Sequence, residues 1–415
     1  MERGRLNGGH TALTAKTFAQ CWSLDATGNW MKYLEDTNGD GTWDLNQVRT
    51  ANTVNEITDI TETAGASWVT PVYSRAGNMT TMPQPAAPAS SYTATYDAWN
   101  RLVKIADGAN TVSEYQYDGT KRRVVQKSYV SGTPSETRHL YYTEPSKWQV
   151  VEERVGSSTD ANLQFVWGQR YVDDLILRDR DTDGNGTLNE QLYSLQDANW
   201  NVSGILNTSG AIQQRFVYTA YGLPVFLNSS FTAASNTAAW EVLYAGYRFE
   251  AGTRLYHVRH RVLNSLPGTW IQRDPLLYAD GLSLYQYCNN SPLDLTDPTG
   301  ELSPPVIGCL TGLAAGTLGS LISDLWANKL EICHSTAQAA FSGIMGCLAG
   351  AILANLTTSS LVLMDALRAL GLTGMATSLW LCPSFRKALA AAGGIGIGAL
   401  MGLASAFADC VCDDC

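Results

Sequence analysis

The sequence is poor in charged residues and lacks the motifs of several common functional classes. Asp, Glu, Lys and Arg make up 16% of the chain, against roughly 25% in average domains, and the formal net charge is −10. Because a phosphate backbone is held by basic surface and no basic patch is present, nucleic acid is not an expected partner. There is no nucleotide-binding glycine loop, no serine-nucleophile elbow and, toward the C-terminus, no nuclease cluster.

Cysteine is scarce before residue 308, and seven of the nine copies follow it. This asymmetry predicts a compositional boundary near Gly300. A chain of 415 residues also exceeds a typical domain of about 100 to 200 residues, so two or more units are expected. Residues 1–30 contain no apolar h-region, and no secretory signal is predicted there.

The stretch from Gly246 to Gly300 is the densest in residues with fixed geometric roles. Arg259 and Arg261 are two positions apart, which predicts that they lie on one face of a strand. Asp274 and Asp297 each precede a proline, which fixes its own φ and disfavours helix in the residue before it. Each of these carboxylates is therefore predicted to sit on a stiff bend.

The second half of this stretch contains Arg273-Asp274-Pro275, Asp280-Gly281-Leu282, Tyr285-Gln286-Tyr287, Asn289-Asn290-Ser291-Pro292 and Asp297-Pro298-Thr299-Gly300. With these motifs the stretch closely resembles the RHS-repeat-associated core domain, whose pattern they match almost letter for letter. The first half departs from that pattern, since Val262-Leu263-Asn264 stands where Tyr-Tyr-Asp is usual.

Upstream, tyrosines recur in related phrases at Tyr73, Tyr96, Tyr117, Tyr193 and Tyr218. The residue after the tyrosine starts a turn, a Gly or Asn a few places later accepts positive φ, and apolar residues then re-enter a strand. A unit of about 20 residues cannot bury its own face, so stacked units predict a spiral β-sheet. Residues 80–90, rich in proline, are expected to be a connection.

The resemblance implies a mainly β fold, in which a spiral YD-repeat sheet forms a partial RHS shell and ends in the core domain. The expected units are a repeat region at 1–240, the core domain at 241–302 and a small Gly/Ala-rich helical segment at 303–415. The family's proteins are usually longer, so this chain is expected to be the C-terminal part of a larger one, and an export signal would then lie upstream.

Two loops share the formula D-T-x-G-x-G-T, at residues 36–42 and 181–187. Both match the opening of a calcium-binding EF-hand loop, but the twelfth position is Gln47 in one and Leu192 in the other, where a bidentate glutamate is needed. Two interpretations stay open, a tight Asp/Gly hairpin turn and a hairpin that binds calcium weakly. The candidate ligands are Asp36, Asn38, Asp40, Asp181, Asp183 and Asn185.

Three uncharged runs follow Gly300, at residues 303–323, 335–364 and 388–408, each long enough to span a bilayer as a helix. Their glycines recur every fourth position, as at membrane helix interfaces. A membrane-active helical segment, a soluble helical bundle and a disordered tail remain alternatives. The terminal Cys410-Val411-Cys412-Asp413-Asp414-Cys415 favours disulfides over half a zinc site.

The resemblance further implies an aspartic self-cleaving protease that cuts after the D-P-x-G motif, without metal or cofactor. The matching residues are Asp274, Asp297 and Arg261. Two neighbouring carboxyls cannot both ionise easily, so the pair can serve as acid and base together. Leucine usually follows the motif, whereas Glu301 intervenes here, so the expected cleavage region is Gly300, Glu301 and Leu302.

The leading hypothesis is a secreted or cell-surface protein of the polymorphic-toxin type that releases its own C-terminal segment as cargo. A membrane, a target-cell surface or an immunity protein would be its partner. The alternative is a non-catalytic surface or adhesion protein whose hydrophobic C-terminal segment is an anchor. A third hypothesis is a displaced cassette without activity.

Overall fold

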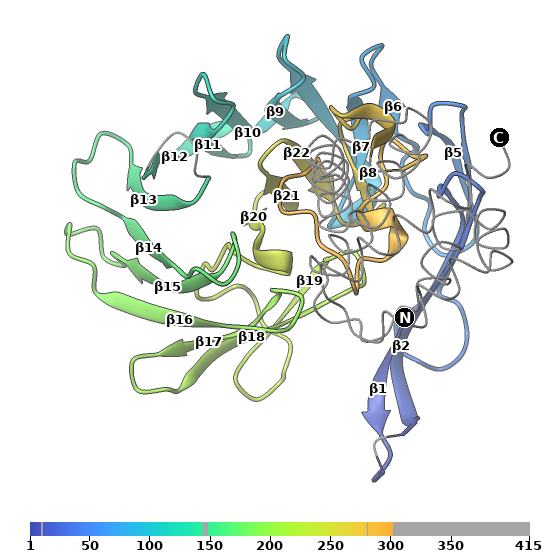
Figure 1. The fold of residues 1–415 in the computed structure, drawn as a ribbon, viewed down its shortest axis with the longest axis horizontal. Helices are drawn as coiled ribbons and strands as arrows, with labels where there is room; N and C mark the ends of the chain where they lie inside the picture. The colour runs from blue at the N-terminus through green and yellow to red at the C-terminus, as the bar shows by residue number, and fades with distance from the viewer. Residues whose placement is uncertain (10, 144–147, 280, 302–415) are drawn as a thin grey trace, which may run out of the picture. The chain divides into compact units, whose positions relative to one another are not determined.

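The computed structural model describes residues 1–9, 11–143, 148–279 and 281–301 (Figure 1). The chain divides into two units, Met1–Glu301 and Leu302–Cys415. The helical segment predicted at 303–415, its three alternatives and its cysteines lie outside the described residues. Within the described residues, no helix is long and apolar enough to cross a bilayer.

The first unit begins with a five-stranded antiparallel sheet in which each strand pairs with the next in sequence. Its strands are β1 (Glu2–Leu6), β2 (Leu13–Leu24), β3 (Trp30–Asp36), β4 (Leu45–Ala51) and β5 (Ile57–Ala64).

A fourteen-stranded antiparallel sheet follows, again ordered as in the sequence. Its strands are β6 (Val72–Tyr73), β7 (Met79–Gln84), β8 (Ala87–Tyr96), β9 (Leu102–Asp107), β10 (Asn110–Tyr117), β11 (Arg123–Val130), β12 (Thr133–Tyr142), β13 (Val150–Val155), β14 (Leu163–Trp167), β15 (Leu175–Arg180), β16 (Glu190–Gln196), β17 (Val202–Asn207), β18 (Ile212–Tyr218) and β19 (Pro224–Leu227).

The remaining described elements belong to residues 241–301, which we call the core segment. Figure 1 shows β20–β22 on the inner side of the curved fourteen-stranded sheet. They are η1 (Tyr244–Gly246), β20 (Arg248–Glu250), β21 (Leu255–Val258), β22 (Arg261–Asn264), β23 (Thr269–Trp270), η2 (Leu277–Ala279) and η3 (Cys288–Asn290). The fold is mainly β, as the sequence predicts.

The repeated turn has one geometry, which Asp97 illustrates. Its Oδ1 accepts hydrogen bonds from the amides of Trp99 at 2.9 Å and Arg101 at 3.0 Å, and Asn100 takes a φ of 61°. Asp118 repeats these contacts with the two residues in the same places, at 2.9 Å each. A short polar side chain thus satisfies the turn amides, and one residue in the left-handed region closes the hairpin.

The repeat tyrosines join successive units. The hydroxyl of Tyr117 donates to the carbonyl of Leu102 at 2.7 Å, and Tyr96 donates to that of Met79 at 2.8 Å. Tyr218 makes the same contact with Val202 at 2.6 Å. Each hydroxyl therefore reaches the residue that begins the strand after the preceding turn, which couples neighbouring repeats side chain to backbone.

Large aromatic side chains fill the space between the sheet and the core segment. The largest side chains below 2% exposure include Trp240, Trp270, Tyr244, Tyr256 and Tyr287. They belong to one cluster with residues of both the five-stranded and the fourteen-stranded sheet. Truncating a buried aromatic side chain to alanine typically costs about 3 to 5 kcal/mol, so this contact contributes strongly to the packing of the unit.

The repeat region does not close by strand pairing among the described strands, since β19 and β6 are the free edges of the larger sheet. Its two ends meet through side chains instead. Trp30 of β3 packs edge-on against Tyr221, in the turn between β18 and β19, with ring centroids 4.7 Å apart. The described strands therefore leave the repeat region open in its hydrogen bonding, and aromatic packing connects its two ends.

Two local predictions were wrong. Residues 80–90 are not a connection, because β7 and β8 pair across a two-residue turn and a register shift at Pro83 and Gln84 accommodates the proline. Arg259 and Arg261 do not share one strand face, because Arg259 lies in the turn that joins β21 to β22.

Candidate active site

Arg261 lies between the two predicted carboxyls. Its Nη2 is 2.8 Å from Oδ2 of Asp274 and 3.3 Å from Oδ2 of Asp297. All three side chains are at most 4% exposed, and the guanidinium stacks over Trp270 at 4.5 Å. The structure therefore brings the three predicted residues together in a buried site.

Asp274 follows β23 and starts a turn, as its Asp-Pro sequence predicts. Its Oδ1 accepts a hydrogen bond from the amide of Leu276 at 2.8 Å. Burial raises the pKa of Asp274, and the nearby Asp297 adds to that rise, while Arg261 opposes it. Asp274 is thus the carboxyl that retains a proton to higher pH than an ordinary aspartate.

Asp297 is held by its own turn. Its Oδ1 accepts from the amide of Gly300 at 2.9 Å and from the hydroxyl of Thr299 at 3.0 Å, while its own amide donates to the hydroxyl of Tyr247 at 2.8 Å. Gly300 has a φ of 70°, and a Cβ there would lie 2.9 Å from the carbonyl oxygen of Val258. Glycine is therefore required at the end of the motif.

The backbone of the predicted cleavage region lies against the same cluster. Nε of Arg261 donates a hydrogen bond to the carbonyl of Gly300. Glu301 follows with its amide donating to the hydroxyl of Thr299 at 3.1 Å and its Oε1 3.5 Å from Nδ1 of His260. Leu302, the third residue of that region, lies outside the described residues.

The ionisable groups around Glu301 are perturbed by burial. Burial lowers the pKa of His260 to about 4, and the cations Lys121, Arg259 and Arg261 lower it further. Burial also raises the pKa of Glu301, and the carboxylates of Asp274 and Asp297 add to that rise. At neutral pH the imidazole is consequently neutral, so its contact with Glu301 is not an ion pair.

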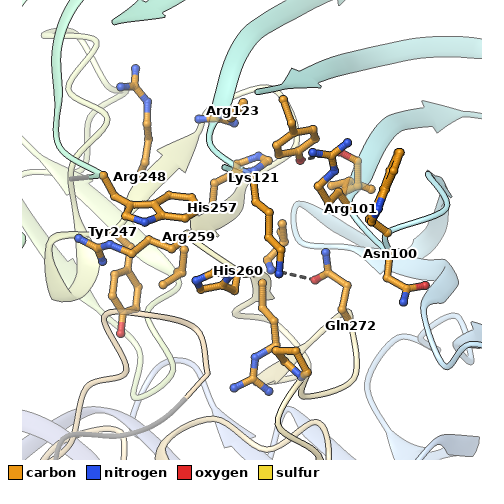
Figure 2. Close-up of a pocket in the computed structure, with 18 of the residues that line it drawn as sticks. Asn100, Arg101, Lys121, Arg123, Tyr247, Arg248, His257, Arg259, His260 and Gln272 are labelled. Atoms are coloured by element: carbon orange, nitrogen blue, oxygen red, sulfur yellow. Dashed lines mark hydrogen bonds between the residues drawn. The ribbon is translucent and has the colours of Figure 1, made fainter. Parts of the chain in front are cut away.

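A cavity of about 400 Å³ opens beside Arg261 and Asp274. Figure 2 shows Lys121, Arg259 and His260 around it. Lys121 lies in the turn between β10 and β11 of the fourteen-stranded sheet, which we call the repeat sheet, and the other two residues belong to the core segment. The lining of the cavity includes Gln272, whose Oε1 accepts a hydrogen bond from the amide of Val262 at 2.9 Å. The space adjoins Asp274 and Arg261 and is large enough for water molecules.

Sequence reasoning missed the roles of Arg259 and Asp173. Arg259 donates to the carbonyl of Pro298 and also to Asp173, which lies in the loop between β14 and β15. A basic residue two places before Arg261 was a weak signal for the contact between Arg259 and Pro298, whereas nothing in the sequence pairs Asp173 with Arg259. Among the other charged residues of the stretch from Gly246 to Gly300, Asp294 is exposed and Arg273 binds Glu56 at 2.8 Å. Asp280 lies outside the described residues.

The two Asp/Gly loops connect strands rather than helices, between β3 and β4 and between β15 and β16. Oδ2 of Asp36 accepts from the amide of Gly41 at 2.8 Å, and Oδ2 of Asp181 accepts from that of Gly186 at 2.8 Å. These bonds close tight loops. In the described part of the chain, no group of three or more His, Cys, Asp or Glu side chains is placed to hold a metal ion.

The other candidate calcium ligands lie within the same loops and also bind loop amides. Oδ1 of Asn38 accepts from the amide of Asp40 at 2.8 Å, and Oδ1 of Asn185 accepts from that of Thr187 at 2.8 Å. Asp183 accepts from the side-chain amide of Asn185 at 3.1 Å. Calcium binding stays an untested prediction.

Comparison with known proteins links the repeats to a named family. A model described as RHS Repeat matches residues 96–134, which contain the turns at Asp97 and Asp118. "Toxin subunit YenC2" of Yersinia entomophaga is 26% identical over 204 residues, 48% of this chain and 20% of that protein. "tRNA3(Ser)-specific nuclease WapA" of Bacillus spizizenii is 26% identical over 216 residues, 51% of this chain and 8% of that protein.

Among solved structures, that of a Photorhabdus luminescens Tc holotoxin pore carrying the TccC3-D651A mutation has a TM-score of 0.39 at 16% identity. The likeness covers 68% of this chain and 18% of that one. The chain thus spans a fifth or less of the length of these three proteins. Residues 96–134 are thus an RHS repeat inside the fourteen-stranded sheet, and the chain is similar to these curated relatives over about half of its own length.

Proposed function

We propose that this chain is part of a toxin-related RHS protein whose core segment hydrolyses its own backbone between Gly300 and Glu301. The observation that carries the proposal is the position of Arg261, which binds both carboxyls and the carbonyl oxygen of Gly300 at once. Cleavage there would separate the repeat sheet from residues 301–415.

The chemistry requires one protonated and one ionised carboxyl. Asp297 takes a proton from a water molecule as the oxygen of that water attacks the Gly300 carbonyl carbon. Arg261 stabilises the negative charge that develops on the carbonyl oxygen, a role whose loss typically slows a reaction about 10² to 10³-fold. Asp274 donates its proton to the leaving nitrogen of Glu301, and the C–N bond breaks.

The proposed reaction is a single self-cleavage rather than turnover. The segment to be cut is held by bonds within its own turn, from Gly300 to Asp297 and from Glu301 to Thr299. Since the substrate is already in place, orientation contributes much of the rate and no external peptide has to bind.

The relatives' names support a role in a toxin system. For this chain, release of the C-terminal segment as cargo, secretion or surface delivery, and a membrane, target cell or immunity protein as partner are part of the proposal. A non-catalytic adhesion role is the competing function, and it predicts that the chain stays intact.

The test compares the wild-type chain with Asp274→Asn and Asp297→Asn by intact mass after refolding from denaturant. We expect the wild type to give two fragments and each variant to cut roughly 10² to 10⁴-fold more slowly, the range lost with an acid or base group.

Asp294→Asn is the matched control, since this exposed aspartate lies in the same segment without contacting the cluster. It should cut as fast as the wild type. A wild-type chain that stays whole, or one that cuts equally fast without either carboxylate, would remove the proposal and favour the adhesion role.

A further inference from the structure

The segment from Asp297 to Glu301 is fixed by contacts to its backbone as well as to its side chains. Arg259 donates to the carbonyl of Pro298, and the amide of His260 donates to that of Thr299 at 3.1 Å. Both residues form the turn between β21 and β22, which therefore lies along the segment just before the bond proposed to break.

Arg259 is held in turn by a carboxylate from the repeat sheet. Its Nη1 and Nη2 donate to the two oxygens of Asp173 at 3.0 and 2.7 Å. The pair is bidentate and largely buried, with side chains 10% and 11% exposed. A two-pronged bond of this kind fixes the orientation of the guanidinium plane, which a single contact does not.

Asp173 itself sits at a fixed place between the sheet and the core segment. It lies in the loop between β14 and β15, and its carbonyl accepts from the amide of Leu175 at 3.0 Å and from the side chain of Gln196 at 3.3 Å. On its other side Gly246 packs so closely that a Cβ there would lie 2.6 Å from Cβ of Asp173. Little room remains for this loop to shift.

The contacts form a continuous chain from the repeat sheet to the scissile region. Asp173 orients Arg259, Arg259 holds the carbonyl of Pro298, and Arg261 holds that of Gly300 two residues later. A displacement of about 1 Å in the reacting groups can slow a reaction about 10²-fold.

We propose that Asp173 and Arg259 are positioning residues that place the 297–301 segment on the carboxyl pair, so that cleavage occurs only once the repeat sheet has folded against the core segment. This inference depends on the self-cleavage proposed above. Its consequence is a specific order of events, in which the sheet assembles before the C-terminal segment is set free.

The test measures cleavage of the full-length chain after refolding, with Asp173→Asn and Arg259→Met beside the wild type. Each variant should cut about 10 to 100-fold more slowly. Arg259→Lys keeps a positive charge for Asp173 and one donor but loses the planar fork, so it should recover only part of the rate lost in Arg259→Met. The dependence of the rate on pH should keep its shape, because Asp274 is untouched.

Asp174→Asn is the matched control. This neighbour is fully buried and binds the exposed Arg170 at 2.6 Å instead of Arg259, so its loss disturbs the same loop without reaching Pro298. It should cut at the wild-type rate. Circular dichroism and the melting temperature of all variants then show whether slow cutting comes with loss of fold.

The outcomes separate the two proposals. If the wild type and Asp297→Asn both stay intact, self-cleavage itself is wrong. If the wild type cuts and Asp297→Asn does not, but Asp173→Asn and Arg259→Met cut at the wild-type rate, the positioning role is overturned. Equal slowing by Asp174→Asn, or no recovery in Arg259→Lys, would also overturn it, since either result indicates a general effect on folding.

Discussion

At the scale of single residues, Arg261 connects two acids to the carbonyl that we propose is attacked. Its Nη2 serves both carboxyls while its Nε serves Gly300. A lysine in this place would offer one point of charge instead of a planar fork, so it could not hold all three partners.

The pH dependence of cleavage follows from Asp274. Burial raises its pKa, so it keeps its proton to higher pH, and above that pKa the protonated fraction falls tenfold per pH unit. We expect the first-order rate of cleavage after refolding to be highest in mildly acidic buffer and to fall with increasing pH.

Glu301→Gln provides a check on this assignment. The Asp274 charge raises the pKa of Glu301, and the effect is mutual, so removing the Glu301 charge should lower the pKa of Asp274. The falling limb of the pH profile should then move to lower pH. A rate that is flat from about pH 4 to 8, or a limb that does not move, would contradict the role given to Asp274.

How far the site could be predicted also depends on the residue. Asp274, Asp297 and Arg261 match a motif, and the sequence alone brought them into one hypothesis. Asp173 could not be found that way, because it lies far upstream and meets Arg259 only through the curvature of the sheet. The contacts of Glu301 depend on a turn whose backbone path no motif specifies.

At the scale of elements, the tyrosine hydroxyls should stabilise neighbouring repeats. Tyr117→Phe removes the bond to the carbonyl of Leu102 and should lower the free energy of unfolding by about 1 kcal/mol. Tyr141→Phe, at a half-exposed position, should change it by less than about 0.5 kcal/mol. Urea unfolding of the two variants measures the difference, and equal stabilities would refute a coupling role.

The Asp/Gly loops should hold their shape without calcium. The amide of Gly186 and, after the opposing effect of burial, that of Gly184 lower the pKa of Asp181, so its carboxylate stabilises the fold above the ordinary aspartate pKa and loses this effect as pH falls. We expect Asp181→Ala to lower the melting temperature equally in EDTA and in calcium. A wild-type melting temperature that rises with calcium, but not in Asp181→Ala, would support the calcium interpretation.

The turns and strands of the repeats were predictable because their signals are local. Asp97 and Asp118 accept hydrogen bonds from backbone amides no more than four residues away. The spacing of the tyrosines indicates the length of the repeat unit. The strands at 80–90 were missed because a proline such as Pro83 has no backbone N–H for strand pairing. The register shift between Pro83 and Gln84 shows how this strand tolerates the proline.

At the scale of the whole described unit, buried charges join the sheet to the core segment. Glu153 of β13 is fully buried, contacts Arg248 of β20 and lies 3.6 Å from Arg138 of β12. Glu241 binds the same two arginines at 2.8 and 2.7 Å. Two acids and two bases thus neutralise one another where the sheet meets the core segment.

Breaking this cluster should destabilise the unit strongly. Glu153→Ala leaves buried arginines undercompensated and should lower the free energy of unfolding by about 3 to 5 kcal/mol. Glu152→Ala removes the neighbouring surface pair with Arg154 and should cost less than about 1 kcal/mol. Denaturant unfolding followed by tryptophan fluorescence tests this, and similar values for both variants would exclude a special role of the cluster.

The most direct test of the central claim is cleavage of the refolded full-length chain in water enriched in ¹⁸O, followed by mass spectrometry of both products. Hydrolysis at the proposed bond predicts a fragment ending at Gly300 with one ¹⁸O in its new carboxyl group and a fragment beginning at Glu301. A single species with the mass of the intact 415-residue chain after prolonged incubation would contradict the account. Two fragments produced by cleavage of a different peptide bond would also contradict it.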